Sequence, residues 1–156
     1  MLRSVIPGFG TLELEHLVLD YNGTLACDGV LIDGVRGRLE HLAQDLRVHV
    51  VTADTFGKAR QALAGLPCGL TVLPVENQDA GKLAYVERLG AERCACIGNG
   101  RNDRLMLKAA ALGIAVIGRE GSAAETLAAA QVVATHINDA LDLLLNPLRL
   151  TATLRS

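Results

Sequence analysis

The chain has no tryptophan, and two tyrosines and two phenylalanines make up its whole aromatic content of 3%. A core without large rings must be filled by aliphatic and small side chains, and hydrophobic residues still account for 50% of the 156 residues. A chain of this length can bury one well-covered core. We therefore expect a single domain over residues 1–156, built from aliphatic strands and helices rich in small residues.

Long apolar runs and an excess of charge are also absent. No run approaches the roughly 20 apolar residues of a membrane-spanning helix, and the first residues, MLRSVIPG, lack a signal-peptide apolar core. The net charge is -2 and the sequence pI is near 6.1, with lysines and arginines scattered along the chain. The sequence thus predicts a cytoplasmic protein whose partners include neither nucleic acid nor a membrane.

The four cysteines, Cys27, Cys68, Cys94 and Cys96, lack C-x-x-C spacing and a nearby histidine cluster, which disfavours a metal site. We interpret them as buried small side chains in a reducing compartment. Cys94 and Cys96 flank Ala95 in a strand-like run, so both should point to the same face of a sheet.

Short aliphatic runs alternate with amphipathic helical stretches, which is typical of β-α-β units. The predicted strands are 12–19, 47–51, 69–73, 94–97, 114–117 and 131–134, and the predicted helices are 35–46, 55–64, 80–89, 102–111, 122–129 and 138–145. Strands without a polar face indicate a mostly parallel sheet covered by helices on both sides. The expected fold class is α/β, as a Rossmann-like three-layer α/β/α sandwich.

A stretch punctuated by glycine and aspartate, 21–34, separates the first strand from the first helix. Its short apolar run, Val30 to Ile32, is suited to one arm of a β-hairpin. We expect a short hairpin flap over residues 26–33.

Unusual polar clusters follow three of the predicted strands: DYNGT at 20–24, TAD at 52–54 and GNGRND at 98–103. In a parallel sheet these clusters meet at the carboxyl edge, where ligands bind. A carboxylate at the mouth of a strand, followed by small residues whose backbone N–H groups can face an anion, suits covalent phosphoryl transfer with Asp20 as nucleophile. The alternative for Asp20 alone is a turn aspartate that caps the next segment.

Two further side chains suit a phosphoryl site. Thr52 is placed either to donate a hydrogen bond to a phosphoryl oxygen or to cap the following helix. Lys82 lies near the start of a helix, where the helix dipole disfavours a cation, so a phosphate or carboxylate facing it explains its position better than solvent does.

Oxygen donors suited to Mg²⁺ occur in the same clusters. Asp20, Asp103, the side-chain carbonyl of Asn99 and a main-chain carbonyl near Asn22 could supply ligands. Asn102 and Asp103 can also be interpreted as helix caps, although the glycines that precede them make a cap alone a less sufficient explanation.

In this order, the clusters and Lys82 resemble the four motifs of the haloacid-dehalogenase-like (HAD) superfamily, from about residue 17 to 117. The resemblance implies Asp20 as nucleophile, with Asn22, Thr52 and Lys82 at the catalytic centre. It also implies substrate contacts from Gly23, Thr24, Ala53 and Asn102, and Mg²⁺ held by Asp20, Asn22, Asn99 and Asp103. The spacing of the motifs leaves no room for a cap domain.

Two positions depart from the phosphatase pattern. Asn22 stands where the family has the acid that protonates the leaving group and activates water, so fast turnover is not expected. Asn99 stands where a metal-binding aspartate is usual, so weak Mg²⁺ binding is expected. A residue other than an acid at the position of Asn22 is shared with P-type ATPases, and the sequence resembles a soluble, P-type-ATPase-like member.

Capless sugar-acid phosphatases of the superfamily share the flap and often complete their site with a neighbouring subunit. We therefore expect a homo-oligomer, such as a tetramer, with a small phosphorylated substrate. The competing hypothesis is a catalytically impaired regulatory or phosphate-binding module, for which Asn22 and Asn99 are the evidence. A dinucleotide-binding domain is disfavoured because the loop at 98–103 lacks a G-x-G-x-x-G opening.

Overall fold

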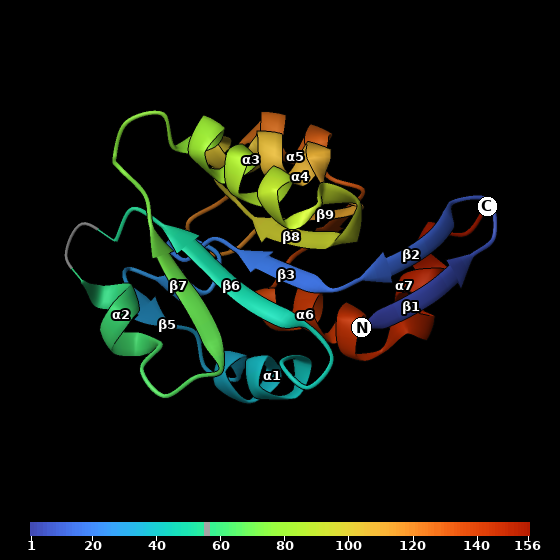
Figure 1. The fold of residues 1–156 in the computed structure, drawn as a ribbon, viewed down its shortest axis with the longest axis horizontal. Coiled ribbons are helices and arrows are strands. Elements are labelled where there is room, and N and C mark those ends of the chain that lie inside the picture. The colour runs from blue at the N-terminus through green and yellow to red at the C-terminus, as the bar shows by residue number, and fades with distance from the viewer. Residues whose placement is uncertain (55–56) are drawn as a thin grey trace.

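The computed structural model describes residues 1–54 and 57–156, which fold around a six-stranded parallel sheet (Figure 1). The strand order is β10-β9-β8-β3-β6-β7, and each neighbouring pair is parallel. The strands are β3 (His16–Leu19), β6 (Arg47–Thr52), β7 (Cys68–Val72), β8 (Cys94–Gly98), β9 (Leu112–Val116) and β10 (Val132–Ala134). The long crossovers that parallel pairing requires are supplied by helices.

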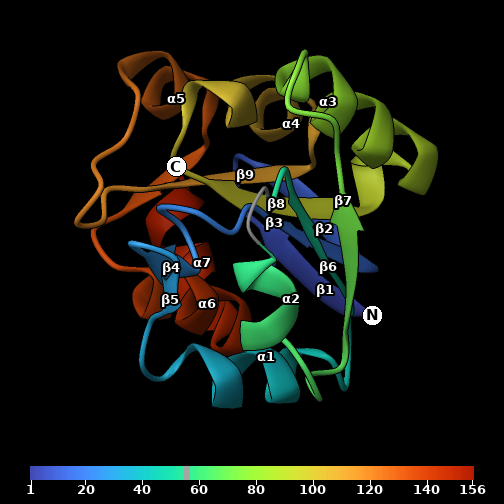
Figure 2. The same cartoon turned by 90° about the vertical axis from the view of Figure 1, so that its left-hand side faces the viewer.

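Helices cover both faces of this sheet. They are α1 (Val35–Leu42), α2 (Lys58–Ala62), α3 (Gln78–Leu89), α4 (Arg104–Ala109), α5 (Ala124–Ala129), α6 (Ile137–Leu145) and α7 (Pro147–Leu154), with 3-10 turns η1 (Ala91–Arg93) and η2 (Arg101–Asp103). Figure 2 shows α3, α4 and α5 on one side of the sheet and α1, α2 and α6 on the other. The predicted three-layer α/β/α fold is confirmed.

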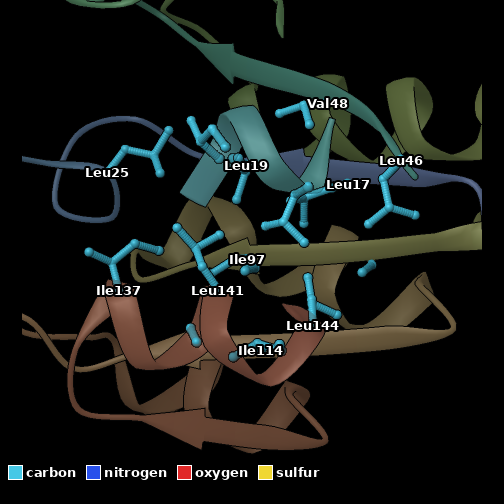
Figure 3. Packing of buried hydrophobic residues seen from close by; sticks show 14 of the residues in the cluster. Leu17, Leu19, Leu25, Leu46, Val48, Ile97, Ile114, Ile137, Leu141 and Leu144 are labelled. Carbon is cyan, nitrogen blue, oxygen red and sulfur yellow. The ribbon is translucent and has the colours of Figure 1, made fainter. Parts of the chain in front are cut away.

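The two faces of the sheet carry separate apolar clusters because side chains alternate along each strand. Leu17, Leu19 and Ile97 pack against the α6 residues Leu141 and Leu144 on one side (Figure 3). Burial of each such side chain stabilises the fold by roughly 1.5–3 kcal/mol.

Cys94 and Cys96 join Val18 and Met106 in the cluster on the other face of the sheet. The prediction that these two cysteines share a face is therefore confirmed. Cys94 and Cys96 are buried, Cys27 and Cys68 are partly buried, and all four are free thiols.

The strand predicted over 12–19 is in fact divided, and this prediction was wrong in its extent. Its first part belongs to β2 (Gly10–Leu14), which pairs antiparallel with β1 (Leu2–Ile6) in a separate two-stranded sheet. The apolar–polar alternation at Leu12 and Leu14 is that of a hairpin with one buried face, whereas the four residues of β3 are all buried. The change in periodicity marks the point where the chain leaves the hairpin and enters the central sheet.

The β1–β2 hairpin extends from the main body and packs on α7 (Figure 1), an element that was also not predicted. The Ser4 and Thr151 hydroxyls lie 3.2 Å apart, and the Ser156 N–H donates to the Pro7 carbonyl at 3.1 Å. The two ends of the chain therefore support each other.

The predicted flap is present as β4 (Ala26–Cys27) and β5 (Val30–Leu31), which pair antiparallel. Asp28 and Gly29 form its turn, with φ of 52° and 79°, as a tight two-residue hairpin turn requires. Between β3 and α1 this hairpin is the only insertion, and the described part of the β6-to-α3 segment holds only α2 and β7. The expected absence of a cap domain thus agrees with the described residues.

The helix predicted over 55–64 corresponds to α2, which begins at Lys58. The first two positions of that prediction, Thr55 and Phe56, lie outside the described residues. Within the described ranges, none of the helices is long and apolar enough to cross a membrane.

Candidate active site

Asp20 directly follows β3, and its backbone N–H donates to the Ile97 carbonyl at 3.0 Å, so it continues the pairing with β8. Only 6% of the residue is exposed. Oδ1 accepts a hydrogen bond from Lys82 Nζ at 2.7 Å, and Oδ2 accepts one from the Thr24 hydroxyl at 3.1 Å. The carboxylate is thus held in a fixed orientation at the carboxyl edge of the sheet.

Lys82, on α3, lies between two carboxylates and is 1% exposed. Its Nζ donates to Asp20 Oδ1 and, at 2.6 Å, to Asp103 Oδ1. Burial lowers the pKa of Lys82, but Asp20 and Asp103 together outweigh burial and leave its pKa above the ordinary value. The alternative that Lys82 is a solvated surface lysine is therefore wrong.

Asp103 is fully buried at the end of η2. While Oδ1 accepts from Lys82, Oδ2 accepts from the backbone N–H groups of Asn99 at 3.0 Å and Gly100 at 2.9 Å. Burial raises the pKa of Asp103 and the charge of Asp20 adds to this rise, while Lys82 and Gly100 oppose it. Because both oxygens are occupied, this arrangement favours a role in positioning Lys82 over a role as a metal ligand.

The loop between β8 and η2 depends on glycine for this close packing. A Cβ at Gly98 would lie 2.5 Å from the Asp103 carboxyl carbon, and one at Gly23 would lie 2.4 Å from Asn99 Nδ2. Gly23 also has φ of 77°. Both glycines allow the polar loops to approach each other.

Asn99 faces Asp20 across the Thr24 hydroxyl. Thr24 Oγ1 is 3.1 Å from Asn99 Oδ1, and the Asn99 Nδ2 donates to the Gly121 carbonyl at 3.0 Å. The bond to Gly121 fixes which end of the amide is oxygen, so Oδ1 points towards the Asp20 side. The single hydrogen of the Thr24 hydroxyl serves either Asp20 or Asn99 at one time.

Thr52 ends β6, the strand next to β3, and is 2% exposed. Its hydroxyl accepts from the Asp54 backbone N–H at 3.3 Å. Asp54 in turn accepts from the backbone N–H groups of Ala59 at 2.8 Å and Arg60 at 3.3 Å. Asp54 therefore provides the cap at the start of α2, and the alternative helix-capping role for Thr52 loses its support.

Three other predicted residues lie at the rim of the site. Asn22 is exposed, and Ala53 is partly buried between Thr52 and Asp54. Asn102 Nδ2 donates to Gln78 Oε1 at 2.7 Å, which ties η2 to the start of α3. Among the described contacts, Asn102 thus joins two elements of the site and does not bond to Asp20.

The oxygens that face the Thr24 hydroxyl fit a hard cation. Asp20 Oδ2 and Asn99 Oδ1 each lie 3.1 Å from Thr24 Oγ1, and the amide oxygen of Asn99 is oriented by Gly121. Mg²⁺ typically takes one or two carboxylates and keeps several waters. One carboxylate and one neutral oxygen therefore fit the predicted Mg²⁺, as a site of low charge.

Sequence reasoning missed a supporting layer from the loop after β9 and from α5. The Ser122 hydroxyl donates to the Asn99 carbonyl at 2.9 Å, and the Thr126 hydroxyl donates to the Gly100 carbonyl at 2.7 Å. The signal was available, because the glycine- and serine-containing segment 118–122 follows a predicted strand and so reaches the same sheet edge.

Comparison with known proteins finds sequence relatives for part of the chain. A scan against protein-family profiles finds no match. The chain is 48% identical over 83 residues to the uncharacterized protein MJ0073 of Methanocaldococcus jannaschii, which covers 51% of this chain and 89% of that protein. It is 27% identical over 116 residues to the phospholipid-transporting ATPase NEO1 of Saccharomyces cerevisiae, across 74% of this chain but 9% of the ATPase.

Two solved structures show the same fold. The cobalt-bound deoxy-D-mannose-octulosonate 8-phosphate phosphatase of Haemophilus influenzae has a TM-score of 0.72 at 15% identity, covering 92% of this chain and 94% of that chain. The 3-deoxy-D-manno-octulosonate 8-phosphate phosphatase of Moraxella catarrhalis, in complex with magnesium, phosphate and KDO, has a TM-score of 0.66 at 16% identity, covering 85% and 86%.

Like these two phosphatases, the chain is a capless α/β sandwich, and it carries an aspartate after β3, a buried lysine on α3 and an Asn–Asp loop after β8. The chain belongs to the same family as MJ0073, and its fold is the one seen in these HAD-like phosphatases.

Proposed function

We propose that this chain is a phosphoric monoester hydrolase that transfers the phosphoryl group of a small phosphorylated substrate to Asp20. The observation that carries the proposal is the Asp20 carboxylate itself, fixed by Lys82 at 2.7 Å and Thr24 at 3.1 Å at the carboxyl edge of the sheet. A nucleophile oriented in this way needs little reorganisation to attack. The likeness to phosphatases of the same fold supports the proposal.

In the first step, an Asp20 carboxylate oxygen forms a bond to phosphorus while the bond from phosphorus to the leaving alcohol oxygen breaks. The alcohol leaves with a proton from water, because the amide of Asn22 has no acid proton to give. Water then attacks phosphorus, which releases inorganic phosphate and restores the Asp20 carboxylate. The aspartyl-phosphate is the covalent intermediate.

The other predicted residues take supporting roles. Lys82 and Thr52 bind phosphoryl oxygens, and Asp103 holds Lys82 in place. The backbone and side chains of Gly23, Thr24, Ala53 and Asn102 border the bound phosphoryl group.

We propose Mg²⁺ as cofactor, held by Asp20, Asn99 and a main-chain carbonyl near Asn22. When bound, it would supply positive charge against the phosphoryl oxygens. The set contains one carboxylate, so we expect the affinity to be weak.

Asn22 favours a second candidate function, a catalytically impaired regulatory or phosphate-binding module. General acid–base assistance contributes about 10²–10⁴ to rate, and an exposed asparagine in the acid's position removes it. If the chain is a phosphatase, Asn22 makes the aspartyl-phosphate long-lived. In the alternative, Asp20 is never phosphorylated.

The deciding experiment measures phosphorylation and turnover together. Wild-type protein, Asp20→Asn and Asn22→Asp are incubated with acetyl phosphate, with Mg²⁺ or with a chelator, and both phosphate release and hydroxylamine-labile labelling are followed. We expect labelling with slow release in the wild type, no labelling in Asp20→Asn, and release raised by about 10²-fold or more in Asn22→Asp. If the wild type is not labelled and Asn22→Asp gains no activity, the chain is a binding module.

We propose that residues 1–156 act as one hydrolase domain and assemble into a homo-oligomer, such as a tetramer, through the flap at 26–33.

A further inference from the structure

A cavity of about 490 Å³ lies between the flap and the loops that follow β9 and β10. Its volume is within the range of about 300–1,000 Å³ typical of sites for small molecules. One wall is the turn at Gly23 and Thr24. The cavity therefore adjoins the candidate active site and is not a separate surface feature.

Thr24 connects the cavity to the candidate active site. Its hydroxyl binds Asp20 Oδ2 at 3.1 Å, and the same residue lines the cavity. A phosphoryl group at Asp20 therefore has the cavity on its flap side, within reach of whatever alcohol the phosphorus carries.

The walls of the cavity are fixed by hydrogen bonds at the tip and base of the flap. The Tyr21 hydroxyl, from a fully buried residue, donates to the Gly29 carbonyl at 3.0 Å, and the Asp28 N–H donates to Glu120 at 3.3 Å. At the base, Asn138 Nδ2 donates to the Asp33 carbonyl at 2.9 Å. The cavity is thus formed before any ligand binds, which lowers the cost of binding.

The lining of the cavity is mainly apolar. Its larger apolar side chains are Val30, Leu31, Ile32, Val116 and Ile137. A sugar hydroxyl that points at these five side chains would find no hydrogen-bond partner among them, which is costly. An apolar alcohol would gain from burial of its surface.

Charge at the rim restricts the ligand further. Asp28, Asp33 and Glu120 contribute three carboxylates, whereas Arg119 is the single lysine or arginine in the lining. An alcohol that bears a second phosphate or a carboxylate would be repelled. The rim therefore favours an uncharged leaving group.

From this lining and its continuity with Thr24, we infer that the cavity is the leaving-group subsite and that it takes the uncharged, apolar alcohol of a phosphate monoester. The inference rests on the proposed function, because it assigns the alcohol of the same reaction. It names the substrate class as aryl or branched-alkyl phosphates.

The test compares 1-naphthyl phosphate with phenyl phosphate, two aryl esters that differ mainly in apolar size. We expect the wild type to prefer the naphthyl ester by on the order of tenfold in kcat/KM, from the extra apolar carbons buried. Calorimetric titration of both esters into Asp20→Asn should show the same order of affinities without turnover. Val30→Asp, which places a charge in the flap wall, should reduce the preference to about twofold or less.

The matched control is Leu148→Asp, an equivalent change on α7, where Leu148 is 85% exposed and outside the cavity lining. The naphthyl-to-phenyl ratio should be unchanged in this variant. Using a ratio cancels any effect of a substitution that is common to both esters.

The outcomes separate the inference from the proposed function. If acetyl phosphate labels Asp20 in a hydroxylamine-labile form and the two aryl esters have equal kcat/KM, the inference is overturned and the phosphatase proposal stands. Tighter binding of the naphthyl ester to Asp20→Asn, without any labelling of the wild type, overturns the phosphatase proposal and with it the assignment of a leaving group. A Val30→Asp ratio equal to that of the wild type also overturns the inference.

Discussion

Replacing Lys82 by methionine removes the cation between two buried carboxylates while nearly keeping the side-chain volume. In the wild type, Lys82 Nζ is 2.7 Å from Asp20 Oδ1 and 2.6 Å from Asp103 Oδ1, and the side chains are 1%, 8% and 0% exposed. After the change, two negative groups remain with little access to water. The expected consequence is a large loss of stability at neutral pH.

The magnitude follows from the cost of an uncompensated buried charge. Removing one partner of a buried ion pair destabilises a protein by about 3–5 kcal/mol, which is a large part of a total stability of about 5–15 kcal/mol. The double variant Lys82→Met/Asp103→Asn removes one of the carboxylates as well. We expect it to recover about 1–3 kcal/mol of that loss, because the two side chains are in direct contact.

The pH dependence has a definite sign. The pKa of Asp103 is already raised by burial and by Asp20, and without Lys82 it rises further. A folded-state pKa above the unfolded value means that the folded state binds more protons, so the free energy of unfolding falls as pH rises from the unfolded pKa towards the folded pKa. The deficit of Lys82→Met should therefore be larger at pH 7 than at pH 4.

Urea unfolding followed by circular dichroism at several pH values measures these differences. Lys108→Met, an exposed lysine on α4, is the control and should change stability by no more than about 0.5 kcal/mol. A loss in Lys82→Met below about 1 kcal/mol that is the same at both pH values would refute the buried triad of charges.

Two further predictions concern the turn at Gly23 and the hydrogen-bonded pair of His16 and His49. In urea unfolding, Gly23→Ala should destabilise the protein by about 1–3 kcal/mol, because φ is 77° and the new Cβ would lie 2.4 Å from Asn99 Nδ2. Gly37→Ala on α1, with open space around it, should be neutral or stabilising. Equal effects of the two substitutions would contradict the reasoning. His49 bonds His16 at 3.0 Å and the Tyr85 hydroxyl at 3.0 Å, and burial foremost lowers the pKa of both histidines. Because the unfolded chain binds more protons, the free energy of unfolding should fall as pH drops below about 6.5 towards the folded pKa values. His49→Gln should flatten this pH dependence, and His41→Gln, at an exposed position, should not. Identical pH dependences in the two variants would count against the coupling of His16, His49 and Tyr85.

The central sheet could be predicted from the sequence because its strands lack a polar face. The predicted strands at 47–51 and 94–97 differ from β6 and β8 by one residue at the carboxyl end. The β1–β2 hairpin and α7 were missed, although Pro7 and Gly8 form a recognisable turn and Pro147 stands at the first position of a helix. These elements pack on each other at the edge of the fold, so their existence depends on tertiary contacts.

The sequence predicted which residues come together in the site, but not which of their atoms form hydrogen bonds. The polar clusters indicated that Asp20 and Asp103 belong to one edge of the sheet, since parallel strands end together, and the helix dipole and the family resemblance placed Lys82 with them. The sequence could not reveal that both oxygens of Asp103 are occupied by Lys82 and by backbone N–H groups. That detail depends on the turn at Gly98 and Gly100, which only the folded loop defines.

The hydrogen bonds of Asn99 distinguish an asparagine that merely replaces a metal-binding aspartate from one that has a structural function of its own. Its Nδ2 donates to the Gly121 carbonyl at 3.0 Å, and its backbone carbonyl accepts from Ser122 and from Ala123. An aspartate here would lose the bond to Gly121 and would place a carboxylate oxygen against a carbonyl oxygen. The loop is therefore built around an amide.

The same amide alters the charge balance of the site. With Asn at positions 22 and 99, the buried groups are two carboxylates and one ammonium, so the site carries about one negative charge. Acids at both positions would add two more and would repel a phosphate dianion before any cation is bound. Under the proposed function, this charge balance predicts weak attraction for a divalent cation, easier entry of a phosphate ester and slow hydrolysis of the phosphorylated aspartate.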